Sequence, residues 1–303
     1  MASGSCVSVY TVTRSSSSSK KKVLKSAVND IPSLSFKIIK NDSVHYEHDS
    51  TVLSVQIIKD ARMITGTHDG HLCLWNLETR ELANIRTDAH SSAITGLKAI
   101  QHVADHGKLL QEEDSFDMFT CSLDGSLCKW KITSPNLSTL EMDTRLNVGN
   151  IPLTSLTITF KDQPQQDSEK RDLNKYVWLG GVDAMIRLYD IQNMKCLKVF
   201  RRHHTLGTFI QGLIPAFPSN NLSEHMDETR KSPLNGCCWS IGQHDTKMLY
   251  WNPSLTIDPL ISLRQDNHDG ASEESGKLFA CSAALPGFLL VGGSDAKISI
   301  YKL

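Results

Sequence analysis

The chain has little of what membrane insertion, secretion and nucleic-acid binding require. No stretch approaches the roughly 18 uninterrupted apolar residues of a membrane span, and no apolar signal-peptide core lies near the N-terminus. Lys and Arg number 32 against 33 Asp and Glu, so the net charge of -1 gives no general attraction to phosphate backbones or anionic lipid. We expect a soluble, unsecreted protein of the nucleus, the cytoplasm or both, without a membrane partner and without direct nucleic-acid binding.

Signatures of catalysis are equally scarce. The patterns GxSxG and HExxH, a phosphate-binding loop and the Rossmann glycines are all missing. The eight cysteines show no CxxC spacing and fall mostly in predicted strands, where a reduced thiol acts as a small buried hydrophobe. We therefore expect a non-enzymatic protein with no cofactor and no small-molecule substrate.

A pattern that is present returns five times: an Asp is followed six residues later by an aromatic residue, with apolar residues alternating between them. The pairs are Asp69 with Trp75, Asp124 with Trp130, Asp183 with Tyr189, Asp245 with Trp251, and Asp295 with Tyr301. They recur at intervals of 55, 59, 62 and 50 residues. Asp and a small residue form a tight turn, and the alternation after it is typical of a strand. Such a period indicates one strand-turn-strand module stacked on copies of itself.

Four of these repeats hold four short strand signals each, and the fifth holds three. In the first repeat the signals are TVLSVQII, ARMITGT, HLCLWNL and ELANIRT; in the fifth they are KLFACSAAL, GFLLVGG and KISIYKL. An unpaired outer edge invites aggregation, so another segment must cover it. We predict that residues 1–47 do so, with strand candidates at 6–12 and 35–41. Between them, Ser15 to Ser19 and Lys20 to Lys22 form a low-complexity linker or a basic targeting signal.

The segment MITGTHDGHLCLWNLETRELANIRTDAH resembles a WD repeat of a β-propeller, and the resemblance extends over residues 48–303. It implies a single all-β domain over 1–303 with about six four-stranded blades, five clear and one partial. It also implies a structural tetrad of His, Ser or Thr, Asp and Trp in each blade. The matching residues are His48, Thr65, Asp69 and Trp75 in the first repeat and His90, Thr120, Asp124 and Trp130 in the second. A buried carboxylate needs donors, so the tetrad is expected to stabilise the fold.

The later repeats depart from the tetrad. Gly149 and Asn150 stand where the third repeat should have its His, and Tyr189 replaces the Trp. The fourth repeat keeps Asp245 and Trp251, and the fifth ends with Tyr301. We expect the third to fifth blades to be held less rigidly. Trp178 and Trp239, next to the tetrad positions, are expected to fill the core or to anchor an interface.

Propeller connectivity sorts the loops into two faces. Three long connections between first and second strands, at about 102–117, 161–174 and 218–235, should lie on one rim, as mobile surface loops or as a partner-binding rim. On the other face, the residues just before each turn Asp are candidates for partner binding: His68, Leu123, Val182, His244 and Ser294.

Two clusters of polar residues have alternative interpretations. Arg201, Arg202, His203 and His204 form a basic tract that contacts a phosphate or an acidic peptide, or else an ordinary solvated turn. The HxxH pairs His45 with His48 and His68 with His71 could hold a transition metal. Because His48 matches the tetrad and the others suit exposed loops, no metal site is predicted.

The resemblance implies a non-enzymatic scaffold or adaptor that binds other proteins in a multiprotein complex. Many independently variable loops on a fixed frame suit the binding of several partners. The alternatives are a regulatory, non-catalytic subunit of a nucleic-acid-modifying or chromatin-associated enzyme complex, and a propeller enzyme acting at the channel mouth.

Overall fold

The computed structural model describes only part of the chain in enough detail for analysis. The described residues are 2–3, 6–14, 36–58, 62–101, 116–133, 138–161, 174–201, 204, 207–216, 236–243, 247–253, 259, 261–264, 278–285, 288–293 and 298–302. The three long connections and the low-complexity stretch lie largely outside this set. The chain divides into two compact units, Met1–Val52 and Leu53–Leu303.

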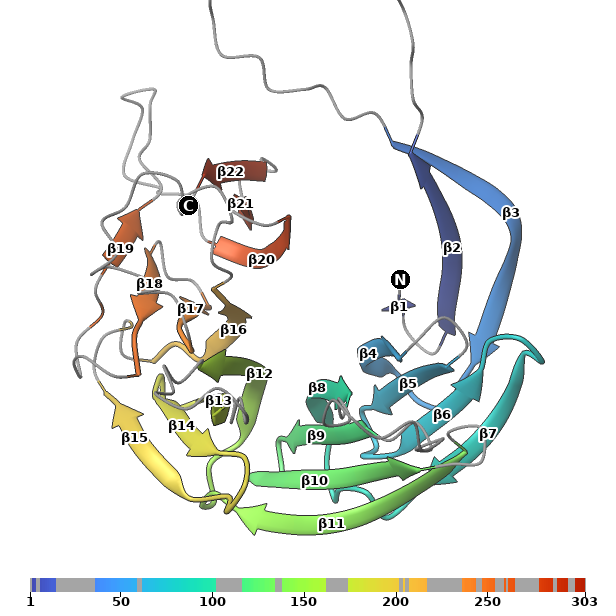
Figure 1. Cartoon of the computed structure of the whole chain (residues 1–303), viewed down its shortest axis with the longest axis horizontal. Coiled ribbons are helices and arrows are strands. Elements are labelled where there is room, and N and C mark those ends of the chain that lie inside the picture. The colour runs from blue at the N-terminus through green and yellow to red at the C-terminus, as the bar shows by residue number, and fades with distance from the viewer. Residues whose placement is uncertain are drawn as a thin grey trace, which may run out of the picture. The chain divides into compact units, whose positions relative to one another are not determined.

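The first unit contains an antiparallel sheet of three strands in the order β1-β2-β3 (Figure 1). They are β1 (Ala2–Ser3), β2 (Cys6–Arg14) and β3 (Phe36–Glu47). Both predicted N-terminal strands therefore exist, and they pair with each other from Cys6 opposite Glu47 to Arg14 opposite Phe36. That this segment completes the last repeat stays a prediction.

The second unit contains five sheets, each built from strands that are consecutive in the sequence. The first sheet has β4 (Val52–Ile58), β5 (Arg62–Thr67), β6 (Leu72–Asn76) and β7 (Glu81–Arg86); the second has β8 (Ile94–Gln101), β9 (Phe116–Ser122), β10 (Ser126–Thr133) and β11 (Thr139–Asn147). The third has β12 (Leu153–Lys161), β13 (Asn174–Gly181), β14 (Ile186–Asp190) and β15 (Cys196–Phe200); the fourth has β16 (Ile210–Pro215), β17 (Cys238–Gly242), β18 (Lys247–Trp251) and β19 (Ile261–Arg264). The fifth has β20 (Leu278–Leu285), β21 (Phe288–Gly293) and β22 (Ile298–Lys302).

The all-β, propeller-like arrangement is thus confirmed, and four four-stranded blades of the expected six are seen in the described residues. The described residues form four four-stranded sheets and two three-stranded ones rather than six four-stranded sheets. The fifth repeat offers only three strands, and the N-terminal strands hydrogen-bond to one another.

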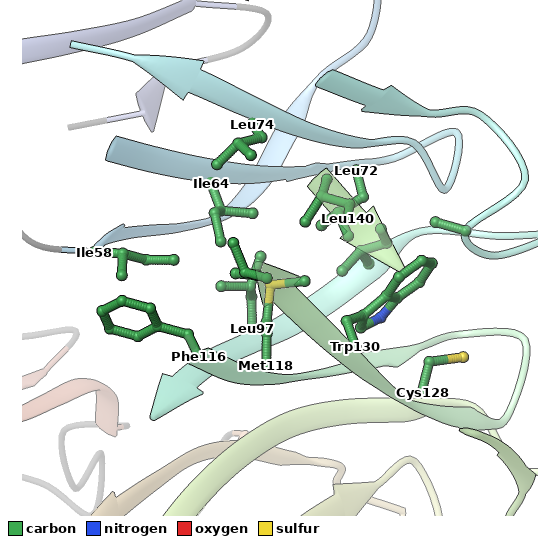
Figure 2. Close-up of a cluster of buried hydrophobic side chains, with 13 residues drawn as sticks. Ile58, Ile64, Leu72, Leu74, Leu97, Phe116, Met118, Cys128, Trp130 and Leu140 are labelled. Carbon is green, nitrogen blue, oxygen red and sulfur yellow. The ribbon is translucent and has the colours of Figure 1, made fainter. Parts of the chain in front are cut away.

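Successive sheets of the second unit share hydrophobic clusters. Between the first and second sheets, Ile64 and Leu72 meet Leu97, Met118 and Trp130 (Figure 2). Comparable clusters join the second sheet to the third, the third to the fourth, and the fourth to the fifth. Trp178 and Trp239 belong to the last two of these clusters and are buried, so both fill the core. Each fully buried large side chain contributes about 1.5–3 kcal/mol.

Side-chain hydroxyls also fasten each of the first three sheets to the next. Ser54 Oγ donates to the Ile94 carbonyl at 3.1 Å, and Thr95 Oγ1 donates to the Leu153 carbonyl at 2.7 Å. Thr154 Oγ1 and Ser155 Oγ both donate to the Ile210 carbonyl, at 2.7 and 3.0 Å. We call these the inter-sheet hydroxyl bonds. They recur at the start of the innermost strands, where β8 and β12 carry bulges at Thr95 and Thr154.

The turns between second and third strands depend on a left-handed residue after the Asp. Gly70 and Gly125 have φ of 82° and 79°, and their carbonyls accept from His90 N at 3.1 Å and Val148 N at 2.9 Å in the following connections. The third repeat has Ala184 at this position, with φ of 58°. A left-handed alanine is strained by about 1–2 kcal/mol because its Cβ crowds the following carbonyl.

Ala184→Gly is therefore expected to raise the free energy of unfolding by about 1 kcal/mol, despite the greater flexibility of glycine in the unfolded chain. Urea denaturation of both proteins measures it. Ala93→Gly is the control, since Ala93 is also buried but lies outside the left-handed region. That variant should lose stability, and a loss in Ala184→Gly as well would contradict the strain.

Candidate functional site

The second sheet brings its four predicted tetrad residues together in one buried network. Trp130 Nε1 donates to Thr120 Oγ1 at 2.9 Å, and Thr120 Oγ1 lies 2.8 Å from His90 Nε2. His90 Nδ1 lies 3.1 Å from Asp124 Oδ2. Because Asp124 can only accept, His90 carries its proton on Nδ1 and receives the Thr120 proton at Nε2. A directed chain of hydrogen bonds therefore runs from Trp130 on β10 to Asp124 in the turn.

Other groups of the second repeat converge on the same carboxylate. Asp124 accepts from Ser126 Oγ at 2.6 Å, from Ser126 N at 2.9 Å and from Ser91 N at 3.0 Å. Burial alone would raise the pKa of Asp124, but these donors and His90 outweigh it and lower that pKa to about 2. Burial lowers the pKa of His90, although Asp124 opposes this effect, so the imidazole is neutral at pH 7.

The first sheet shares the bond from Trp to Thr with the second sheet but differs at its Asp. Trp75 Nε1 donates to Thr65 Oγ1 at 3.2 Å, as in the second sheet. The Asp69 side chain, however, is 55% exposed and pairs with the neighbouring His68 at 3.4 Å. His48 Nδ1 lies 3.1 Å from the Tyr46 carbonyl. The expected sequestered carboxylate is thus found at Asp124 and not at Asp69, which has His71 where Asp124 has the hydroxyl of Ser126.

In the fourth sheet the predicted Trp251 is joined by two residues, His204 and Ser240, that the sequence analysis did not assign to a tetrad. Ser240 Oγ on β17 accepts from Trp251 Nε1 at 2.7 Å and lies 2.7 Å from His204 Nε2. His204 is buried, which removes it from the basic tract proposed for phosphate or acidic peptides. Arg201 is exposed, whereas Arg202, His203, His244 and Asp245 lie outside the described residues. The available signal was a His before the first strand and a Ser on the second.

The third sheet replaces the tetrad with an ion pair. Arg187 Nη1 and Nη2 bind Asp183 Oδ1 and Oδ2 at 3.2 and 2.5 Å, and the Arg187 side chain is only 8% exposed. Tyr189 is buried, and burial raises its pKa to about 12. In the fifth repeat, Ser294, Asp295 and the Tyr301 side chain lie outside the described part of the chain.

Three of the predicted partner-binding residues are exposed at successive turns: His68, Leu123 and Val182, which we call the turn surface. Leu123 is 36% and Val182 42% exposed, although both are large and apolar. Their backbones are fixed, since Leu123 N donates to the Ala93 carbonyl at 3.0 Å and Val182 N to the Pro152 carbonyl at 3.1 Å. These turns therefore hold apolar side chains in water on a rigid support.

The described residues contain neither a cluster of metal ligands nor a membrane-spanning helix. No group of three or more His, Cys, Asp and Glu side chains there is arranged to hold a metal ion. Nor does that part of the chain contain a helix long and apolar enough to cross a bilayer.

Comparisons with known proteins agree with this geometry. No protein-family model matches the chain. A Gallus gallus protein named p21-activated protein kinase-interacting protein 1-like is 22% identical over 170 residues, covering 51% of this chain and 44% of that protein. The match thus spans less than half of that relative.

Solved structures with the same fold include U3-55K and the computationally designed Ika8 protein. U3-55K has a TM-score of 0.57 and 17% identity, covering 85% of this chain and 64% of its own; Ika8 has 0.51 and 19%, covering 85% and 60%. These likenesses support the fold, and the network of His90, Thr120, Asp124 and Trp130 supports the repeat type. The chain is thus similar to WD-repeat β-propeller proteins in its fold and in the tetrad of its second sheet.

Proposed function

We propose that this protein is a non-enzymatic scaffold subunit that binds other proteins through the turn surface within a multiprotein complex. The observation that carries the proposal is the exposure of Leu123 and Val182 at two successive turns whose backbones are hydrogen-bonded in place. An apolar side chain on a backbone that is already held in place costs no backbone ordering on binding and gains from leaving water, which is typical of interface anchors.

The comparison with the chicken protein supports a protein partner. Its name describes a protein that interacts with a p21-activated protein kinase, and the aligned part covers half of this chain. The rival role in a nucleic-acid-modifying complex depended on the basic tract, which loses His204 to the core. We also propose that the protein is located in the nucleus, the cytoplasm or both.

The double substitution Leu123→Glu and Val182→Glu is expected to reduce the recovery of stoichiometric partners at least tenfold, since two anchors of at least about 1 kcal/mol each are lost. Affinity purification of tagged protein followed by quantitative mass spectrometry measures the recovery.

Leu197→Glu is the matched control, because Leu197 is equally exposed but lies on β15, away from these turns. Circular dichroism melting checks that all variants are folded. Unchanged recovery in the double variant would exclude the turn surface. A purified monomer that has no partner and turns over a small molecule would contradict the scaffold role.

A further inference from the structure

In the described residues, the joint between the fourth and fifth sheets shows no hydroxyl bond like those that fasten the earlier sheets. The inter-sheet hydroxyl bonds come from Thr95 at the bulge of β8 and from Thr154 at the bulge of β12. At the corresponding bulge of β16 stands Gln211. Its Oε1 is buried and has no hydrogen-bond partner in the structure. The fourth joint therefore has an unpaired acceptor where the second and third joints have a hydrogen bond.

A second unpaired group also lies in the fourth sheet. Trp178 Nε1 in the third sheet donates to Thr159 Oγ1 at 2.8 Å, and Thr159 Oγ1 donates to the Gly236 carbonyl of the fourth repeat at 2.9 Å. Trp239 occupies the position of Trp178, because Trp178 lies opposite Thr157 and Trp239 opposite Ile214.

The residue of the fourth sheet that corresponds to Thr159, two positions after Ile214, is Ala216. Ala216 has no hydroxyl, and the buried Trp239 Nε1 has no hydrogen-bond partner in the structure. The cluster around Trp239 includes Leu289 and Val291 of β21, so the unpaired donor faces the fifth sheet.

Unpaired polar groups of this kind weaken a buried joint, because each one loses its bonds to water and regains them when the joint opens. The third joint also buries an unpaired Thr157 Oγ1. There, however, Thr154, Ser155 and Thr159 all donate across to the fourth repeat. Local opening follows the lowest local free energy, and among the contacts of the described residues the fourth joint has the fewest bonds to oppose it.

We propose that the fifth sheet, β20 to β22, is a detachable element that separates reversibly from the fourth sheet while the first four sheets stay folded. Separation rehydrates Gln211 Oε1 and Trp239 Nε1 and transiently uncovers the apolar side chains of Ile241, Met248 and Leu289. The second unit is thus built with one joint that opens before the others.

Hydrogen exchange of the full chain, followed by mass spectrometry of peptides, tests the proposal. The measurement is made under conditions where exchange reports local stability. We expect the amides of β20 to β22 to exchange at least ten times faster than those of β8 to β10. Equal protection in both sets would overturn it.

Substitutions at Ala216 test whether the unpaired Trp239 Nε1 causes the fifth sheet to separate. Ala216→Thr restores the acceptor present at Thr159, and Ala216→Val adds similar volume without a hydroxyl. Relative to Val, Thr is expected to slow exchange in β20 to β22 about fivefold, the effect of one hydrogen bond, with β8 to β10 unchanged. Equal exchange in the two variants would overturn the role of Trp239.

Gln211→Thr and Gln211→Val form a second pair, in case position 216 does not accept a larger side chain. Threonine is the residue found at Thr95 and Thr154, and we expect the same local slowing relative to valine. If neither threonine variant slows exchange in the fifth sheet, the unpaired groups do not control its opening.

Discussion

Gly125→Ala is expected to lower the free energy of unfolding by about 2–5 kcal/mol. Two costs add: a left-handed alanine is strained by about 1–2 kcal/mol, and overpacking costs about 1–3 kcal/mol more. A Cβ on Gly125 would lie 2.3 Å from the Gly149 carbonyl oxygen, which is backbone and has little room to move. Urea denaturation followed by tryptophan fluorescence measures the loss.

Gly207→Ala separates these two costs. Gly207 has φ of 84°, close to that of Gly125, but a Cβ there would meet nothing within 4 Å. This variant should lose only the conformational part, about 1–2 kcal/mol. If the two variants lost equal stability, the close approach of the Gly125 turn to the next connection would not exist in solution.

Asp124→Ala is expected to cost about 3 kcal/mol. The substitution leaves Ser91 N, Ser126 N, Ser126 Oγ and His90 Nδ1 without their shared acceptor, and buried donors without a partner cost about 1–3 kcal/mol. Thermal and urea denaturation of the variant measure the loss. Asp69→Ala provides the control, because that carboxylate is half exposed and should contribute no more than about 0.5 kcal/mol. Equal stability of Asp124→Ala and the parent protein would contradict the network.

The same residues set the dependence of stability on pH. The pKa of Asp124 is lowered from 3.8 to about 2, so its stabilisation is complete above pH 3.8 and is lost as the pH falls toward 2. The pKa of His90 is also lowered, so the unfolded chain takes up a proton below its ordinary pKa of 6.5 while folded His90 stays neutral. Stability therefore also decreases as the pH falls below 6.5. Melting temperatures measured from pH 8 to pH 2 should show the lower step in the parent protein and a smaller one in Asp124→Ala.

The repeat placed the strands correctly because turn chemistry and apolar alternation are local properties of the sequence. The strands that follow Asp69, Asp124, Asp183 and Asp245 are β6, β10, β14 and β18. In the fourth repeat Asp245 and Trp251 were predicted, but His204 and Ser240 were missed because the spacing differs by one residue. Ser240 precedes Asp245 by five positions, whereas Thr65 and Thr120 precede their Asp by four. Because of this one extra residue between Ser240 and Asp245, His204 and Ser240 did not match the spacing of the tetrad.

Other parts of the site could not be read from the chain because they depend on tertiary neighbours. Arg187 has no sequence signal that distinguishes it from an exposed arginine, yet its bonds to Asp183 are made in a buried setting. The unequal exposure of Asp69 and Asp124 depends likewise on which donors surround two similar turns.

The inter-sheet hydroxyl bonds have a consequence for how such a chain can evolve. The acceptors for Ser54, Thr95 and Thr154 are main-chain carbonyls, which every amino acid possesses. A mutation in the receiving strand that preserves its path leaves the acceptor intact, so neighbouring modules need not change in concert. For these bonds to persist, a duplicated or exchanged module needs only to retain its own serine or threonine.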